Sequence, residues 1–254
     1  MIGIFDSGVG GLSVLRELKK ISPQIDVIYF GDIQNVPYGI KSQEELKNLT
    51  LLGVKKLLEN GATNIISACN SVSTFMLLKE IKFLSETPFE IIEMISPTVD
   101  EFSCYKNIAI FATPATIESQ TYQNNFKQKE IEIKTFSIPE LAGAIEFDLA
   151  KNKIEKIINR AVSKSSTEHF DVAILCCTRY SFVKKNFEKA FKKMGKKVKI
   201  FDPAETVAKK SISKFNNING SGKLKFLISK DSPNFKKMVI EHFNNQKYII
   251  EVIK

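Results

Sequence analysis

The chain has 254 residues, of which 43% are hydrophobic and 26% are charged, as in a folded globular protein with one large domain or two domains of about 100–150 residues. No apolar run approaches the roughly 18–20 residues of a membrane-spanning helix. The net charge of +9 raises the possibility of nucleic-acid binding. However, the basic residues are mostly Lys spread over expected helix faces, which favours a solvated surface, and the few Arg residues are Arg16, Arg160 and Arg179.

The start of the chain and its cysteines indicate a reducing compartment. Met1 leads directly into an expected strand at residues 2–5 rather than into a charged signal peptide, so the cytoplasm is the expected location. The cysteines have no metal-ligand spacing, and a reducing compartment argues against disulfides. We expect Cys104 and Cys176 to be structural and examine Cys69 and Cys177 below.

Strand-like and helix-like segments alternate along the chain. Strands are expected at residues 2–5, 27–30, 65–68, 91–94, 108–111, 131–136, 172–175, 198–201, 223–228 and 248–253. Helices are expected at residues 12–18, 42–60, 75–83, after 112–116, 151–165, 182–193, from 204 onward, and 233–243, with loops at 36–39 and 216–222. Such alternation predicts an α/β fold of parallel sheets with helices on both faces.

The first strand leads into a glycine-rich turn at residues 6–11. Such a turn presents backbone N–H groups at a helix N-terminus, where an anion can bind. It matches neither the dinucleotide-binding pattern nor a Walker loop. A functional interpretation would use Asp6 and Ser7 at the carboxyl end of the strand, whereas a plain turn with a helix cap fits equally well. The turn alone leaves both interpretations open.

A faint internal repeat relates the two halves of the chain. Residues 2–5 resemble residues 108–111, and in each half a later strand leads to a cysteine, Cys69 or Cys177. The pattern restarts after residues 95–97, which we interpret as a crossing point between the halves. Because ligands bind outside the carboxyl ends of strands in open α/β sheets, two facing halves would place these cysteines on opposite walls of one cleft. Chance similarity between short Ile-rich strands is the alternative.

Two opposed thiols suit the inversion of a stereocentre. That reaction needs a base on one face of a carbon and an acid on the other, and a desolvated thiolate and a thiol can serve as this pair. A cysteine hydrolase would instead place one cysteine beside a histidine. The histidines, His169 and His242, lie in no small-residue loop, so we expect them to have core or surface roles.

Several motifs together resemble one family. They are Phe5-Asp6-Ser7-Gly8-Val9-Gly10-Gly11, Pro37-Tyr38-Gly39, Ala68-Cys69-Asn70-Ser71, Ala115-Thr116-Ile117, Cys177-Thr178 and Asp202-Pro203-Ala204. In them the sequence resembles the glutamate racemases of the aspartate/glutamate racemase superfamily, in the right order over nearly the whole chain. The resemblance implies two pseudo-symmetric parallel-sheet α/β domains facing across a cleft, made of residues 1–96 plus 205–254 and of residues 97–204.

The resemblance also implies a reaction and a site. The reaction is 1,1-proton transfer between L- and D-glutamate without cofactor or metal, which supplies D-glutamate for bacterial peptidoglycan, in an enzyme expected to be a homodimer. Cys69 and Cys177 would be the acid/base pair, and Asp6 would assist Cys69. The implied substrate-binding residues are Ser7, Tyr38, Gly39, Asn70, Ser71, Thr113, Thr116, Thr178 and Arg179.

Two positions depart from the family pattern. Ser71 replaces the usual Thr and keeps its hydroxyl, whereas Arg179 replaces a His thought to assist the second thiol. Arg cannot shuttle protons, but it can favour the Cys177 thiolate or bind a carboxylate. Glu146 stands where the family has an acidic residue near that His, so we expect an Arg179–Glu146 ion pair, with a surface Arg as the alternative.

Arg179 leaves two further functions open beside glutamate racemisation. One is a racemase for aspartate or another polar amino acid. The other is a non-catalytic homologue that binds an acidic amino acid without turnover.

Overall fold

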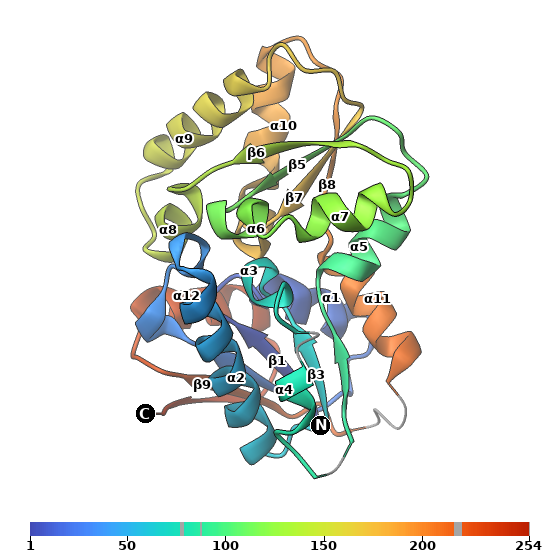
Figure 1. The fold of residues 1–254 in the computed structure, drawn as a ribbon. Coiled ribbons are helices and arrows are strands. Elements are labelled where there is room, and N and C mark those ends of the chain that lie inside the picture. Colours follow the sequence, from blue (N-terminus) through green and yellow to red (C-terminus); the bar gives the residue numbers. More distant parts are fainter. Residues whose placement is uncertain (77–78, 87, 216–219, 254) are drawn as a thin grey trace.

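The computed structural model describes residues 1–76, 79–86, 88–215 and 220–253. These residues form two lobes, each built on a parallel sheet with helices on both faces, and the N- and C-terminal ends lie in the same lobe (Figure 1). The predicted α/β fold with two facing domains is confirmed. The boundaries predicted at residues 96/97 and 204/205 stay a prediction.

The two sheets share one strand order over four strands. In the first lobe the order is β10 (Tyr248–Val252), β9 (Leu224–Ile228), β2 (Val27–Gly31), β1 (Ile2–Asp6), β3 (Asn64–Ser67) and β4 (Glu90–Ile92). In the second it is β6 (Ile133–Ser137), β5 (Ile108–Ala112), β7 (Val172–Cys176) and β8 (Lys199–Phe201). All paired strands are parallel. The repeat seen in the sequence is therefore a repeat of topology, with β1 matching β5 and β3 matching β7.

Helices cover both faces of each sheet (Figure 1). Those of the first lobe, with two short 3₁₀ turns, are α1 (Leu12–Ile21), η1 (Ile33–Asn35), η2 (Tyr38–Ile40), α2 (Gln43–Glu59), α3 (Asn70–Ser73), α4 (Lys79–Lys82), α11 (Ala204–Lys214) and α12 (Pro233–Phe243). Those of the second are α5 (Ile95–Phe102), α6 (Pro114–Glu118), α7 (Thr121–Lys127), α8 (Leu141–Glu146), α9 (Lys151–Lys164), η3 (Thr178–Val183) and α10 (Lys184–Lys193).

Each central strand packs on both faces because successive side chains point to opposite sides. Along β1, Ile2 and Ile4 pack in the core formed with α1, α11 and α12, whereas Phe5 packs in the core formed with α2 and α3. Along β5, Phe111 faces the helices α8, α9 and α10, and Ile110 faces α5 and α7. Burial of such large apolar side chains contributes about 1.5–3 kcal/mol each, which fixes the strand register and hence the position of each strand end.

Several element boundaries differ from those expected. Residues 95–97 are not a plain crossing point but the start of α5, and the expected strand 91–94 ends at Ile92 because the Glu93 carboxylate accepts hydrogen bonds from the N–H groups of Ile95 and Ser96 and caps that helix. Of the helix expected at 75–83, the described residues form helix α4 at 79–82 and a turn at 75–76, and residues 77–78 lie outside the part of the chain that the structure describes. The sequence analysis also missed α8.

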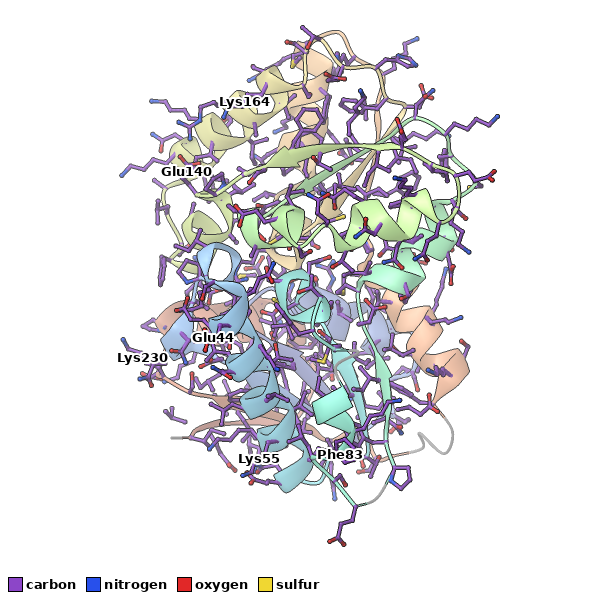
Figure 2. All side chains as sticks on the ribbon, viewed as in Figure 1. Glu44, Lys55, Phe83, Glu140, Lys164 and Lys230 are labelled. Atoms are coloured by element: carbon purple, nitrogen blue, oxygen red, sulfur yellow. The ribbon has the colours of Figure 1, made fainter. Side chains whose placement is uncertain are left out.

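Charged side chains are spread around the molecule. Figure 2 shows Lys55, Lys164 and Lys230 at three separate places on its outline, all exposed to solvent. Cys104 is exposed as well, whereas Cys176 is fully buried. No helix in the described part of the chain is long and apolar enough to cross a membrane.

Candidate active site

The two predicted thiols lie at matched strand ends. Cys69 follows β3 and immediately precedes α3, and Cys177 follows β7 and immediately precedes η3. Their exposed fractions are only 4% and 5%. Both side chains line one small cavity between the lobes. The two cysteines therefore lie close to one another, while their shared role in one reaction stays a prediction.

Most of the other predicted site residues line the same cavity. They are Ser7, Tyr38, Gly39, Asn70, Ser71, Thr113, Thr178 and Arg179, together with Ala142, which the sequence analysis did not single out. Asp6 and Thr116 lie behind this lining and hydrogen-bond to it. Hydroxyl, amide, thiol and guanidinium groups make up most of this lining, which suits a small polar molecule.

Cys69 is a buried thiol with one hydroxyl neighbour. Its Sγ lies 3.7 Å from the Ser7 Oγ. Burial, and after it the Asp6 carboxylate, raise the pKa of the Cys69 thiol to about 11 against the opposing effect of the Arg179 cation. Cys69 is therefore a neutral thiol near pH 7 in the free protein.

Cys177 has a different set of neighbours. Burial raises the pKa of its thiol to about 12, while the Arg179 cation and a hydrogen bond with the backbone N–H of Arg179 lower it. A thiolate with so high a pKa is a strong base once it forms. Both thiols thus combine neutrality at rest with high basicity after deprotonation.

The Asp6 carboxylate joins the two lobes. Its Oδ1 accepts from the Gly8 N–H at 2.7 Å, and its Oδ2 accepts from the Thr178 hydroxyl at 3.1 Å. Burial raises the pKa of Asp6, and the Arg179 cation opposes this increase. Both Asp6 oxygens already have donors, so any assistance to Cys69 acts through charge.

Arg179 is buried, so the surface-residue alternative is wrong. Its exposed fraction is 3%, and its Nε donates to Glu146 Oε2 at 2.6 Å, which confirms the predicted ion pair. Both terminal guanidinium nitrogens donate to the Ser7 Oγ at 3.1 Å. Burial acts to lower the pKa of Arg179, but the Glu146 carboxylate, the Asp6 carboxylate and the two thiols together raise it. The guanidinium is therefore a permanent cation that connects the second lobe to the first.

Polar side chains complete the wall around Cys69. The Asn70 Oδ1 accepts from the Tyr122 hydroxyl at 2.7 Å, while its buried Nδ2 has no hydrogen-bond partner within the described residues. Ser71 lies 3.1 Å from the Thr113 hydroxyl and 3.3 Å from that of Thr116. A buried donor without a partner is costly unless a ligand satisfies it.

Two supporting residues were missed. Asp32 accepts from the Tyr38 hydroxyl at 2.6 Å and orients that ring at the cavity. Its position directly after β2, next to the Gly31 that pairs with Asp6 on β1, is a signal that could have identified it. Tyr122, which orients Asn70, lies on α7 and has no local sequence signal.

Glycines allow the two lobes to approach closely. A Cβ added at Gly8 would overlap the Glu146 carboxylate, and one at Gly10 would overlap the Thr178 hydroxyl. A Cβ added at Gly39 would lie 2.5 Å from the Thr113 Cβ. The glycine-rich turn predicted after β1 is thus a close-contact surface between the lobes. Within the described residues, no group of three or more His, Cys, Asp or Glu side chains could hold a metal ion.

Two parallel α/β lobes with a cysteine from each in a shared cavity define a class of two-domain isomerases. Residues 2–210 match the family model described as Asp/Glu/Hydantoin racemase, and the chain belongs to that family. It is similar to glutamate racemase 3 of Caldanaerobacter subterraneus subsp. tengcongensis, with 36% identity over 242 residues, covering 92% of this chain and 87% of that protein.

Other relatives agree in fold and name. The glutamate racemase of Aquifex aeolicus is 32% identical over 241 residues, covering 94% of this chain and 92% of that protein. A solved glutamate racemase from Francisella tularensis, in complex with D-glutamate, has a TM-score of 0.85 and 25% identity, covering 100% of this chain and 97% of that one.

Proposed function

We propose that the protein interconverts L- and D-glutamate without a cofactor, with Cys69 and Cys177 as the two proton-transfer groups. The observation that carries this proposal is the pair of buried thiols, one from each lobe, lining one small cavity. The family membership supports a racemase, and the names of the relatives support glutamate as substrate.

The proposed reaction exchanges one proton for another at the α-carbon. In one direction the thiolate of one cysteine removes the α-proton, and the thiol of the other donates a proton to the opposite face. After this step the first cysteine is a thiol and the second is a thiolate. The reverse reaction starts from this state of the two cysteines. Burial supports the step, because it keeps water away and makes each thiolate a stronger base.

The polar wall provides donors for the carboxylates of the substrate. The unpartnered Asn70 Nδ2 is the first candidate, since a bound carboxylate would satisfy it. The hydroxyls of Ser71, Thr113 and Thr178 lie on the same wall and are further candidates, together with Tyr38. Asp6 would act on Cys69 by charge, and Thr116 would orient Ser71.

Aspartate is the second candidate substrate, because Arg179 stands where the family has a His and lies on the wall of the cavity. The test is a chirality-resolved assay in D₂O, without added cofactor and after treatment with a chelator, on both enantiomers of glutamate and aspartate. We expect the opposite enantiomer of glutamate to form with deuterium at its α-carbon. Turnover of aspartate alone would reassign the substrate, and absence of exchange with every substrate would instead indicate a binding protein.

We also propose the biological setting that the resemblance implies. D-glutamate formed in this way would enter peptidoglycan, and the enzyme would act in the cytoplasm as a homodimer. Light scattering of the purified protein tests the dimer. Growth of a strain that lacks glutamate racemase, with and without this chain and with D-glutamate as the rescue control, tests the supply of D-glutamate.

A further inference from the structure

The guanidinium of Arg179 reaches past its own cysteine to the residue beside the other one. Arg179 is two positions after Cys177, yet both of its terminal nitrogens donate to the Ser7 Oγ of the opposite lobe. The same oxygen lies 3.7 Å from the Cys69 Sγ. A continuous chain of contacts therefore runs from Glu146 through Arg179 and Ser7 to Cys69.

The hydrogen-bond capacity of a serine hydroxyl fixes the direction of this chain. A hydroxyl has one proton to donate and two lone pairs that accept. Both terminal N–H groups of Arg179 donate to the Ser7 Oγ, and a guanidinium donates and never accepts. The Ser7 proton must then point elsewhere, and the Cys69 Sγ is its neighbour on that side.

We infer that Arg179 is a positioning residue for Cys69: it orients the Ser7 hydroxyl so that this hydroxyl donates to Cys69 and stabilises its thiolate. The inference deepens the proposed function and rests on it, since it assigns how one of the two bases is prepared. It adds to the expectation that residue 179 acts on Cys177. The cation and the backbone N–H of Arg179 both act on Cys177, and through Ser7 the same side chain also acts on Cys69.

The other groups around Cys69 make this donor important. Asp6 on β1, Tyr29 on β2, Tyr38 on η2 and Cys177 across the cavity are the titratable groups that interact with the Cys69 thiol. The Asp6 carboxylate disfavours a negative charge on Cys69, whereas raised pKa values keep both tyrosines neutral. Arg179 is the cation among these neighbours, and its fixed fork, held on the other side by Glu146, favours a Cys69 thiolate together with the backbone N–H of Val72.

The test compares the two thiols within one molecule. Iodoacetamide alkylates thiolates, and peptide mass spectrometry gives the rates at Cys69 and Cys177 separately at pH values from about 7 to 9. The ratio of the two rates cancels changes in how often the cavity opens, because both thiols line it. The variants are Ser7→Ala, Arg179→Lys and the double variant; Arg179→Lys keeps the charge and the backbone N–H but loses the fork.

We expect the Cys69-to-Cys177 ratio to fall about tenfold in either single variant, because loss of the donor raises the Cys69 pKa by about one unit. The double variant should fall no further than Ser7→Ala alone. Arg160→Lys is the matched control, since its ion pair with Glu140 is exposed, and it should leave the ratio unchanged. An unchanged ratio in Ser7→Ala, or additive effects in the double variant, would overturn the inference.

Two safeguards keep the result interpretable. If Arg179→Lys does not fold, as judged by circular dichroism, Ser7→Ala decides alone, because the same fall is expected from it. Alkylation also needs no turnover. A tenfold fall in a protein that does not racemise glutamate would support the role of Arg179 and refute the proposed function, whereas an active enzyme with an unchanged ratio would do the reverse.

Discussion

The loops that carry Cys69 and Cys177 occupy equivalent strand ends but differ in the partners of their thiols. Cys69 precedes the four-residue helix α3 and has two partners, the backbone N–H of Val72 in its own loop and the Ser7 hydroxyl. Cys177 precedes the 3₁₀ turn η3 and has a backbone N–H of its own loop as partner. The two loops therefore share their backbone topology but not their charged side chains. The Arg179 cation of the second loop also contacts Ser7, which lies beside Cys69 in the first lobe.

This difference follows from the chemistry that two opposed thiols must perform. The proposed reaction needs one thiolate and one thiol at a time, so the two positions need not be equivalent at rest. Separate donors allow the protonation of each thiol to be set independently. Substitutions can distinguish whether the two loops contribute equally to catalysis, contribute unequally, or depend on one another through Arg179.

The largest expected effect is loss of racemisation when either thiol is removed. Cys69→Ser and Cys177→Ser should each lower kcat by about 10²- to 10⁴-fold, the usual contribution of a general acid or base. Each variant should still eliminate a leaving group from a β-substituted amino acid of one handedness, since elimination needs one base. Cys104→Ser, at an exposed position, is the control. Undiminished racemisation in either active-site variant would refute the two-thiol mechanism.

The next effect concerns the ion pair that anchors the shared cation. Glu146→Ala should lower the free energy of unfolding by about 3–5 kcal/mol, because it leaves the buried Arg179 charge unpaired. Glu140→Ala, which breaks the exposed pair with Arg160, should cost at most about 1 kcal/mol. Urea unfolding measures both, and equal effects would mean that the Arg179–Glu146 pair is open to solvent in solution.

Close approach of the lobes can be tested at a glycine outside the reacting groups. A Cβ at Gly10 would overlap the Thr178 hydroxyl next to Cys177, so Gly10→Ala should hold the lobes apart and lower kcat/KM by about 10²-fold. Gly143→Ala is the matched control, because a Cβ there has no neighbour within 4 Å. A Gly10→Ala enzyme with normal kcat/KM would show that catalysis tolerates a more open cavity.

The sequence predicts those site residues whose positions depend only on where strands end and on local spacing along the chain. Buried strands that end in small polar loops place Asp6, Cys69 and Cys177 at the edges of two parallel sheets, and this placement needs only periodicity and topology. The Arg179–Glu146 pair was predicted from the family resemblance, because Glu146 stands where the family has an acidic residue near the His that Arg179 replaces.

Contacts set by how the lobes meet could not be predicted. Arg179 reaches Ser7 because a long side chain crosses between lobes that only the folded molecule brings together. The Tyr122–Asn70 hydrogen bond depends on the placement of α7, for the same reason. The missed helix α5 is short, and its start depends on the Glu93 carboxylate, which accepts hydrogen bonds from backbone N–H groups. Glu93 lies within the segment expected to be a strand, so its role as a helix cap was not considered.

Raised thiol pKa values predict a loss of stability at alkaline pH. Burial raises the pKa of Cys69 to about 11 and that of Cys177 to about 12, from an ordinary value of 9.0. The folded state thus holds these protons more tightly than the unfolded chain does. Their stabilising contribution is complete below about pH 9 and is lost as the pH rises through the folded values, by up to about 1.4 kcal/mol per thiol for each pH unit.

Urea unfolding from about pH 8 to 10.5 measures this decline, and the Cys69→Ser/Cys177→Ser double variant is the comparison. We expect the double variant to lose less stability over the same range, because it lacks both titrating groups. An identical decline would mean that the thiols titrate equally in the folded and unfolded states. Single variants would then separate the contributions of the two loops.

The smallest expected effect concerns Ser71, whose hydroxyl lies between the lobes on the Cys69 side. It is 3.1 Å from the Thr113 hydroxyl and 3.3 Å from that of Thr116, so it is part of a buried cluster of three hydroxyls. Ser71→Ala should lower the free energy of unfolding by about 1 kcal/mol, the typical net contribution of one hydrogen bond. Ser71→Thr keeps the hydroxyl and should change both stability and kcat/KM less than Ser71→Ala does.

The comparison with Thr116→Val separates stability from substrate binding. Thr116 contacts the cluster without lining the cavity, so its substitution should cost similar stability with little change in KM, whereas Ser71→Ala should also raise KM. Equal KM values in the two variants would mean that Ser71 supports the wall but does not bind substrate. In that case Asn70, with its unpartnered Nδ2, would be left as the main donor on the Cys69 side of the cavity.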